Sequence, residues 1–232
     1  MLNSSVQKVL KELNKITNSA IIKYPKTVLI SDSQDIMLDV DISKLDSEQF
    51  PNIHLMNNLG EFIKFLELFD NPEIDLDEKQ IVLKQGTMKS SFIFDNPLLM
   101  NHLDKDSKQF DRTMEVPSVA EFSISVDDFK NIGKASGVFK DLTEIIFESK
   151  DSDVEVVLGA TNRFNAKSDT FSILKPSTSN KDFEVKIPVE NFKILPVSNY
   201  TVHVKYNSEK DSYRLIMVNE DIDLRILLST KV

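Results

Sequence analysis

The side chains best suited to chemistry in this 232-residue chain are acidic clusters, three histidines and a set of lysines. Asp39 and Asp41, and the group Asp75, Asp77 and Glu78, have the oxygen ligands that a divalent cation needs in a metal-dependent nuclease. Residues two apart on a strand share a face. Each cluster borders a predicted hairpin without a histidine or basic partner, so charged strand edges are the favoured interpretation.

Other catalytic signatures are missing from the sequence. There is no Gly-rich phosphate loop, nucleophile elbow or zinc pattern. The absence of cysteine excludes disulfides and thiolate metal sites. His54, His102 and His203 are scattered, and His54 and His203 fall in predicted strands, where a structural role is favoured. We therefore expect no enzymatic activity, no metal and no cofactor.

Lysines recur on predicted helices opposite the apolar face. A helix predicted over residues 4–16 places four apolar residues on one face: Val6, Val9, Leu10 and Leu13. At 100° per residue, Lys8, Lys11 and Lys15 gather on the opposite face. Such a stripe is suited to binding phosphates, and the alternative is an ordinary solvated helix face.

A helix predicted to begin at the capping residue Ser125 repeats this arrangement. Lys130 and Lys134 share its outer face because they lie four residues apart. Three further lysines are weaker candidates for the same role: Lys64, Lys140 and Lys193.

The overall charge of −9 is unusual for a protein that binds nucleic acid. Of the 28 basic residues, only four are arginines. Base-edge recognition relies on the bidentate fork of arginine, whereas lysine acts as a point charge on phosphate. If nucleic acid is bound, we expect backbone contacts without sequence preference. The alternative is that the lysines only solvate the surface.

An internal duplication organises the chain. Residues 50–94 and 183–227 each read as strand, amphipathic helix and three strands, and the pairs Phe50 and Phe183, Lys84 and Met217, and Phe94 and Leu227 are each 133 residues apart. This pattern predicts an α+β protein of two similar domains, at 1–95 and 117–232, each with two helices packed on antiparallel sheet. Residues 96–116 have little periodicity and are predicted to be a linker.

The remaining elements follow from alternation and turn residues. Strands are predicted in the first half at 20–24, 27–31, 36–41, 52–56, 73–76, 80–85 and 89–94. Strands are predicted in the second half at 120–124, 143–149, 154–159, 169–174, 183–187, 200–206, 213–218 and 222–228. Helices are also predicted at 58–69 and 189–195. No apolar run reaches membrane-spanning length and no signal peptide is recognisable, so we expect a cytoplasmic protein without a membrane partner.

Three segments resemble the trimeric DNA sliding clamps of T-even-type bacteriophages: LKELNKITNSAIIK at 10–23, VPSVAEFSISVDDFKNIGKASGVFKDLTEIIF at 116–147, and KIPVENFKILPVSNYTVHVKY at 186–206. The resemblance covers nearly the whole chain. It implies the fold shared with proliferating cell nuclear antigen, and a homotrimeric ring with helices around the central hole. It also implies a processivity factor that encircles duplex DNA, is loaded by a clamp-loader ATPase and tethers a DNA polymerase in the infected cell's cytoplasm.

The resemblance also implies roles for particular residues. The lysine-bearing helices would face the DNA. The strand at 89–94 would pair with 169–174 of the neighbouring subunit, through Lys89, Phe92, Phe94, Thr170, Ser172 and Leu174. An apolar pocket between the linker and the C-terminal domain would hold a partner's peptide, with Leu45, Leu98, Leu99, Leu228 and Val232 as candidates.

Two other functions stay open on the sequence alone. A β-rich module that binds a protein peptide and has no DNA role is the main alternative, and a carboxylate-dependent nuclease is the second. The lysine stripes on corresponding helices favour the clamp over the peptide-binding module. The absence of converging acids with a His or Lys partner argues against the nuclease.

Overall fold

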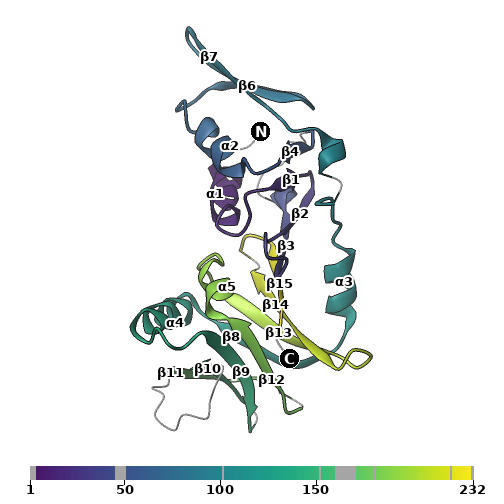
Figure 1. Cartoon of the computed structure of the whole chain (residues 1–232), viewed down its shortest axis with the longest axis vertical. Coiled ribbons are helices and arrows are strands. Elements are labelled where there is room, and N and C mark those ends of the chain that lie inside the picture. The colour runs from purple at the N-terminus through teal and green to yellow at the C-terminus, as the bar shows by residue number, and fades with distance from the viewer. Residues whose placement is uncertain are drawn as a thin grey trace. The chain divides into compact units, whose positions relative to one another are not determined.

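The computed structural model describes residues 4–44, 51–100, 102–151, 153–159, 171–179, 181–219 and 221–230 (Figure 1). The chain divides into two compact units. The first unit comprises Met1–Ser107 with Ile222–Leu224, and the second comprises Lys108–Asp221 with Arg225–Val232.

The first unit begins with a helix and continues through short strands. Its elements are α1 (Ser4–Leu13), β1 (Ala20–Ile22), β2 (Lys26–Ile30), β3 (Ile36–Asp41), η1 (Ile42–Lys44), β4 (Ile53–Leu55), α2 (Leu59–Leu66), β5 (Glu73–Leu76), β6 (Gln80–Gln85), β7 (Met88–Ile93) and η2 (Pro97–Leu99). Four antiparallel pairings lie within it: β1 with β4, β2 with β3, β5 with β6, and β6 with β7.

The start of α2 lies close to the residues that follow α1. A Cβ atom at Gly60 would come within 3.3 Å of the amide nitrogen of Asn14, which directly follows α1. The backbone N–H of Gly60 donates to Asn18 Oδ1 at 3.1 Å, and Asn18 Nδ2 donates to the carbonyl of Asn57 at 2.7 Å. Asn18 therefore fixes the start of α2 against the residues that follow α1.

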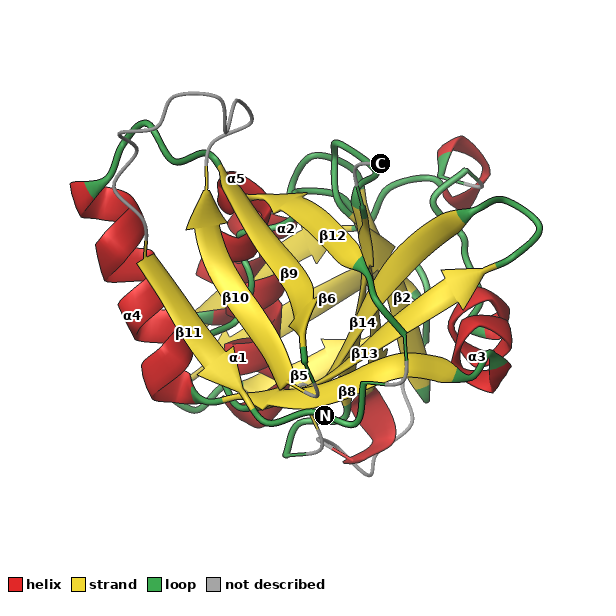
Figure 2. Cartoon of the chain, turned by 90° about the horizontal axis from the view of Figure 1, so that it is seen from below, coloured by secondary structure: helices red, strands yellow, loops and turns green. Residues whose placement is uncertain are grey.

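The second unit contains α3 (Lys108–Glu115), β8 (Ser118–Ile124), α4 (Val126–Val138), β9 (Glu144–Lys150), β10 (Asp153–Gly159), β11 (Phe171–Lys175), β12 (Glu184–Pro188), α5 (Val189–Lys193), β13 (Tyr200–Asn207), β14 (Ser212–Asn219) and β15 (Leu224–Ser229). From β8 onward, the order of one strand, one helix and three strands occurs twice, as β8-α4-β9-β10-β11 and β12-α5-β13-β14-β15. The first strand of each half pairs within the other half's sheet: β8 lies beside β13, and β12 lies beside β9. Figure 2 shows the resulting sheet in the order β11-β10-β9-β12, with α4 packed beside β10 and β11.

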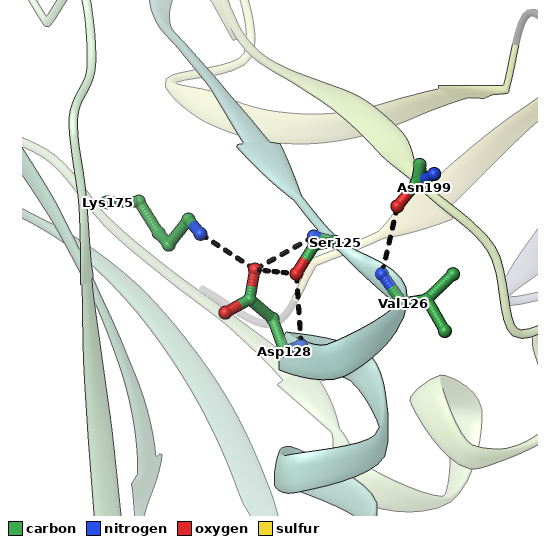
Figure 3. A network of polar contacts seen from close by, with 5 residues as sticks. All are labelled: Ser125, Val126, Asp128, Lys175 and Asn199. Carbon is green, nitrogen blue, oxygen red and sulfur yellow. Dashed lines mark hydrogen bonds and ion pairs between the residues drawn. The ribbon is translucent and has the colours of Figure 1, made fainter.

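The helices of the second unit are fixed at their ends by side chains. Ser125 caps α4 in a reciprocal capping box with Asp128. Asn199, which follows α5, accepts from the backbone N–H of Val126 at 3.0 Å (Figure 3). Phe129 of α4 stacks on Phe192 of α5, with ring centroids 4.0 Å apart. As Asn18 does in the first unit, Asn199 ties the start of one helix to the segment after the other.

The predicted α+β architecture is confirmed, and the predicted strands have counterparts among the described residues. The duplicated order of strand, helix and three strands is present as β4-α2-β5-β6-β7 and β12-α5-β13-β14-β15. The constant spacing fails at the helices: Leu59 and Val189, which begin α2 and α5, are 130 residues apart. The reason is that α5 follows β12 directly, whereas three residues connect β4 to α2.

One local prediction was wrong. The first helix ends at Leu13 rather than near Ile16, and continues only as a turn in which the backbone N–H of Ile16 donates to the carbonyl of Leu13. The segment 96–116, predicted to be a linker, contains η2 and α3.

The second unit holds α3 in place through contacts made by distant strands. Lys205 of β13 donates to the carbonyls of Met114 and Val116, at 3.1 and 2.7 Å. Arg225 of β15 pairs with Asp111 at 2.9 Å and lies over the ring of the buried Phe110. Lys205 thereby satisfies carbonyls at the C-terminal end of α3, which the helix leaves without internal donors.

We expect Ser125→Ala to destabilise the chain by about 1 kcal/mol, because it removes the hydroxyl that accepts from the Asp128 N–H and donates to the Asp128 carboxylate. Denaturant unfolding followed by circular dichroism measures the change. Ser123→Ala, at an exposed position on β8, is the matched control. Equal effects of the two substitutions would contradict the capping role.

Candidate nucleic-acid interface

The lysines of the first unit lie on the solvent side of its helices. Val6, Val9, Leu10 and Leu13 are buried, whereas Lys8 and Lys11 are exposed on the other side of α1. Lys15 is also exposed and lies just beyond the last residue of α1. Lys64 is exposed on α2. The amphipathic pattern thus places these side chains as the sequence predicted.

Some of these charges are already paired. Lys11 forms an ion pair with Glu67, which follows α2, and Lys15 pairs with Glu12 at 2.6 Å. Lys8 and Lys64 have no ion pair with any residue in the described part of the chain. The sequence pattern could not distinguish paired from unpaired lysines, because Lys11 and Glu67 are far apart in the chain.

The second unit repeats the arrangement on α4. Lys130 and Lys134 are exposed, on the side opposite Phe129, Ile132 and Ala135. Neither lysine has an ion pair within the described ranges, and the same holds for the exposed Lys140 that follows the helix. Lys193 of α5 is paired with Glu190 at 3.1 Å.

The helix faces carry acidic residues as well as lysines. Glu61, Asp127 and Glu190 are exposed near the starts of α2, α4 and α5, where the helix dipole favours negative charge. The positive potential over each face is therefore modest and strongly reduced by salt. Such a surface is suited to weak phosphate contacts and not to tight binding by affinity alone.

A network of polar contacts joins the start of α4 to the end of β11 (Figure 3). Asp128 Oδ2 accepts from Lys175 Nζ at 2.7 Å, and from the backbone N–H and hydroxyl of Ser125 at 2.8 and 2.7 Å. Burial alone would raise the pKa of Asp128, but the hydrogen bonds from Lys175 and Ser125 outweigh it and hold this pKa below its ordinary value of 3.8. The pairing is fully present at neutral pH and is lost only as the pH falls through the lowered value.

The two strands expected at a subunit interface are edge strands among those described. The sheet orders are β5-β6-β7 and β11-β10-β9-β12, so β7 and β11 each have one partner. Lys89 of β7, and Ser172 and Leu174 of β11, are exposed. Thr170 lies outside the described residues.

Two phenylalanines assigned to this interface face the core of the first unit. Phe92 is half-buried, with its ring 5.3 Å from that of Phe62, and Phe94 is buried with its ring 6.1 Å from Phe62. The side chain of Phe94 is therefore unavailable to a neighbour in this structure. The sequence analysis missed Ile93, which is 73% exposed. Strand alternation gives the signal, because inward Phe92 requires Ile93 to point outward.

The candidate peptide-pocket residues have different environments. Leu98 and Leu99 are exposed on η2 of the first unit, where the Asn96 side chain accepts from the Leu98 N–H. Leu228 is buried within β15, so its side chain offers no free surface to a peptide in this structure. Leu45 and Val232 lie outside the described residues.

The acidic clusters serve local structure. Asp41 accepts from the N–H and hydroxyl of Ser43, and Asp77 accepts from the N–H groups of Lys79 and Gln80. Within the described ranges, no group of three or more His, Asp or Glu side chains is placed to hold a metal ion. In the same residues, no helix combines the length and apolar character needed to cross a membrane. The nuclease alternative therefore gains no support from the geometry.

No known protein-family model matches the sequence. The chain is, however, 28% identical to the sliding clamp of Vibrio phage KVP40 over 174 residues, which are 74% of this chain and 75% of the phage protein. This similarity agrees with the resemblance to phage clamps inferred from the sequence.

Two solved structures share the fold. Proliferating cellular nuclear antigen from Entamoeba histolytica superposes with a TM-score of 0.67 at 15% identity, covering 98% of this chain and 95% of that one. The PCNA of A. fulgidus, bound to the C-terminal region of FEN-1, gives a TM-score of 0.65 at 14% identity, covering 97% and 94%. The chain thus has the two-unit fold of these proteins along nearly its whole length.

We expect Lys8→Glu and Lys130→Glu to change the free energy of unfolding by less than about 0.5 kcal/mol, because both side chains are exposed and make no ion pair within the described ranges. Lys11→Glu should destabilise more, since it replaces an attraction to Glu67 by a repulsion. Chemical denaturation at several salt concentrations measures both. A loss of stability for Lys11→Glu that is unaffected by salt would contradict this electrostatic explanation.

Proposed function

We propose that this chain is a DNA sliding clamp of the phage type, a ring-forming processivity factor that encircles duplex DNA without sequence preference and tethers a replicative DNA polymerase. The observation that carries this proposal is the similarity to a phage sliding clamp over about three quarters of both chains, combined with the PCNA fold along nearly the whole chain. The functional surface of such a ring is the lining of its central channel, and not a pocket with reactive groups.

The helices of both units line this hole. Lys8, Lys64, Lys130, Lys134 and Lys140 are exposed and, within the described ranges, not neutralised by an acid. Lys11, Lys15 and Lys193 alternate between their acidic neighbours and passing phosphates. Weak contacts of this kind suit sliding, because encirclement and not affinity keeps the protein on DNA. The net charge of −9 is compatible with this role when the acids lie mainly on the outer surface.

Three copies close the ring by pairing β7 of one protomer with β11 of the next. The outward side chains of these strands include the exposed Ile93 and Leu174. The opposite edges of the same two sheets, β5 and β12, expose Glu73, Asp75 and Glu184 instead, and charges of this kind discourage strand pairing. A contact between two different surfaces of one chain makes a closed ring when its rotation fits the copy number.

The clamp is non-catalytic, and its partners supply the chemistry. A clamp-loader ATPase opens the ring around DNA, and a polymerase binds it in the cytoplasm of an infected cell. The exposed Leu98 and Leu99 are apolar positions suited to a partner's peptide. The alternative of a peptide-binding module without a DNA role is not favoured by any observation on the described residues.

We expect the triple substitution of Lys8, Lys130 and Lys134 by Glu to reduce clamp-dependent DNA synthesis at physiological salt by about tenfold or more, because it replaces phosphate attraction by repulsion. Ring assembly should stay intact. Primer extension with the cognate polymerase and loader measures processivity, and sedimentation measures assembly.

A matched control replaces three exposed lysines outside these helices: Lys26, Lys105 and Lys210. It makes the same change in net charge. If both triple variants lose processivity equally, the helix lysines have no special role, and the channel assignment is wrong.

We expect Leu174→Asp to raise the subunit dissociation constant about a hundredfold, because it places a charge in the proposed contact between edge strands. Leu68→Asp is the matched control, since Leu68 follows α2 and is 57% exposed, compared with 54% for Leu174. Sedimentation velocity over a concentration series measures both. A wild-type chain that stays monomeric at every concentration would contradict the ring itself.

A further inference from the structure

Strand β11 is held on one side only. Among the described strands it pairs with β10 alone, in a ladder from Val154 opposite Lys175 to Leu158 opposite Phe171. Its side chains alternate: Phe171, Ile173 and Lys175 are half-buried, and Ser172 and Leu174 are exposed. The position of its open edge therefore depends on this ladder, on contacts made by the half-buried side, and on the segment after the strand, where the Thr178 N–H donates to the Glu121 carbonyl of β8 at 3.2 Å.

Lys175, at the last position of β11, makes the most specific of these contacts. Its ammonium group lies 2.7 Å from Asp128 Oδ2, and the side chains of Lys175 and Asp128 are only 19% and 16% exposed. A charge-assisted hydrogen bond with this degree of shielding is stronger than a fully solvated ion pair. It links the end of a strand to the start of a helix.

The carboxylate that receives Lys175 cannot move freely. The same Oδ2 atom accepts from the N–H and hydroxyl of Ser125, the residue that caps α4. Lys175 is thus tied to the capped start of α4 (Figure 3). The same helix carries Lys130 and Lys134. At the opposite edge of the sheet, Lys186 of β12 pairs at 2.7 Å with Glu184 of its own strand, at 33% and 42% exposure.

We propose that Lys175 is a positioning residue for ring closure: its ion pair with Asp128 fixes the open edge of β11 relative to α4 and so preorganises the strand for the neighbouring protomer. This inference rests on the proposed clamp function, and it adds a determinant of ring stability outside the interface contacts. Pairing at a strand edge requires several backbone groups to be in register together. A strand that is ordered before it binds loses less conformational entropy on association.

The test compares three single substitutions in the full-length chain. Lys175→Met keeps most of the length of the side chain and removes its charge, Lys175→Arg keeps the charge, and Lys186→Met is the control on the opposite edge. We expect Lys175→Met to raise the subunit dissociation constant about tenfold, with Lys175→Arg restoring most of the loss and Lys186→Met having no effect. Sedimentation velocity over a concentration series measures all of them.

A separate measurement distinguishes positioning from general destabilisation. Thermal unfolding of each variant is measured at a protein concentration below its dissociation constant. Lys175→Met should remain folded, with a midpoint only slightly below that of Lys186→Met, because it removes the more shielded of the two ion pairs. Asp128→Asn removes the charge from the other side and keeps an oxygen acceptor for Ser125. Asp128→Asn should raise the subunit dissociation constant as Lys175→Met does. If Lys175→Met fails to fold, Asp128→Asn tests the same ion pair in its place.

Two results would overturn the inference while leaving the clamp function standing. One is a wild-type dissociation constant for both Lys175→Met and Asp128→Asn. The other is an equal weakening of the ring by Lys175→Met and Lys186→Met. A wild-type chain that never assembles would overturn the clamp function and this inference together, so the two failures are distinguishable.

Discussion

The burial of one face of each helix against its own unit is the constraint on which the other features depend. In the first unit, α1 buries Val6, Leu10 and Leu13 and must therefore leave Lys8 and Lys11 in solvent. In the second unit, burial of Phe129 and Ile132 does the same for Lys130 and Lys134. Hydrophobic burial thus decides which side of each helix carries exposed lysines, although the lysines themselves contribute little to stability.

The sheets formed in each unit leave some strand edges without a pairing partner among the described strands. The exchange of β8 and β12 between the two halves of the second unit ties those halves together, but β11 keeps a free edge. Open edges are usually a hazard for soluble proteins. Here the exposed Ile93 and Leu174 on β7 and β11 make these edges candidates for pairing, whereas Glu73 and Glu184 mark β5 and β12 as edges that stay solvated. The ion pair between Lys175 and Asp128 connects one open edge to a helix that carries the proposed DNA-facing lysines.

The duplication was visible in sequence because strands recur at a fixed distance, and β6 and β14 keep that spacing. The spacing between the two copies differs at the helices, because α5 starts directly at the end of β12. The second unit contains a finer repeat, in which one strand, one helix and three strands occur twice. The sequence pattern alone did not reveal this repeat. Its two halves exchange their first strands, so the repeat becomes visible only when the sheet order is known.

Sequence by itself determined the secondary structure wherever one face is buried, because a period of two or 3.6 residues records that burial directly. It therefore located the strands, α2, α4, α5 and the side of each helix on which the lysines lie. Only the tertiary structure decided the features that depend on partners far along the chain. Helix α3 is held by Lys205 and Arg225, Lys11 is neutralised by Glu67, and Leu228 is buried. Lys175 meets Asp128 across 47 residues. No local pattern encodes such contacts, since they arise from the packing of strands and helices that the chain brings together only on folding.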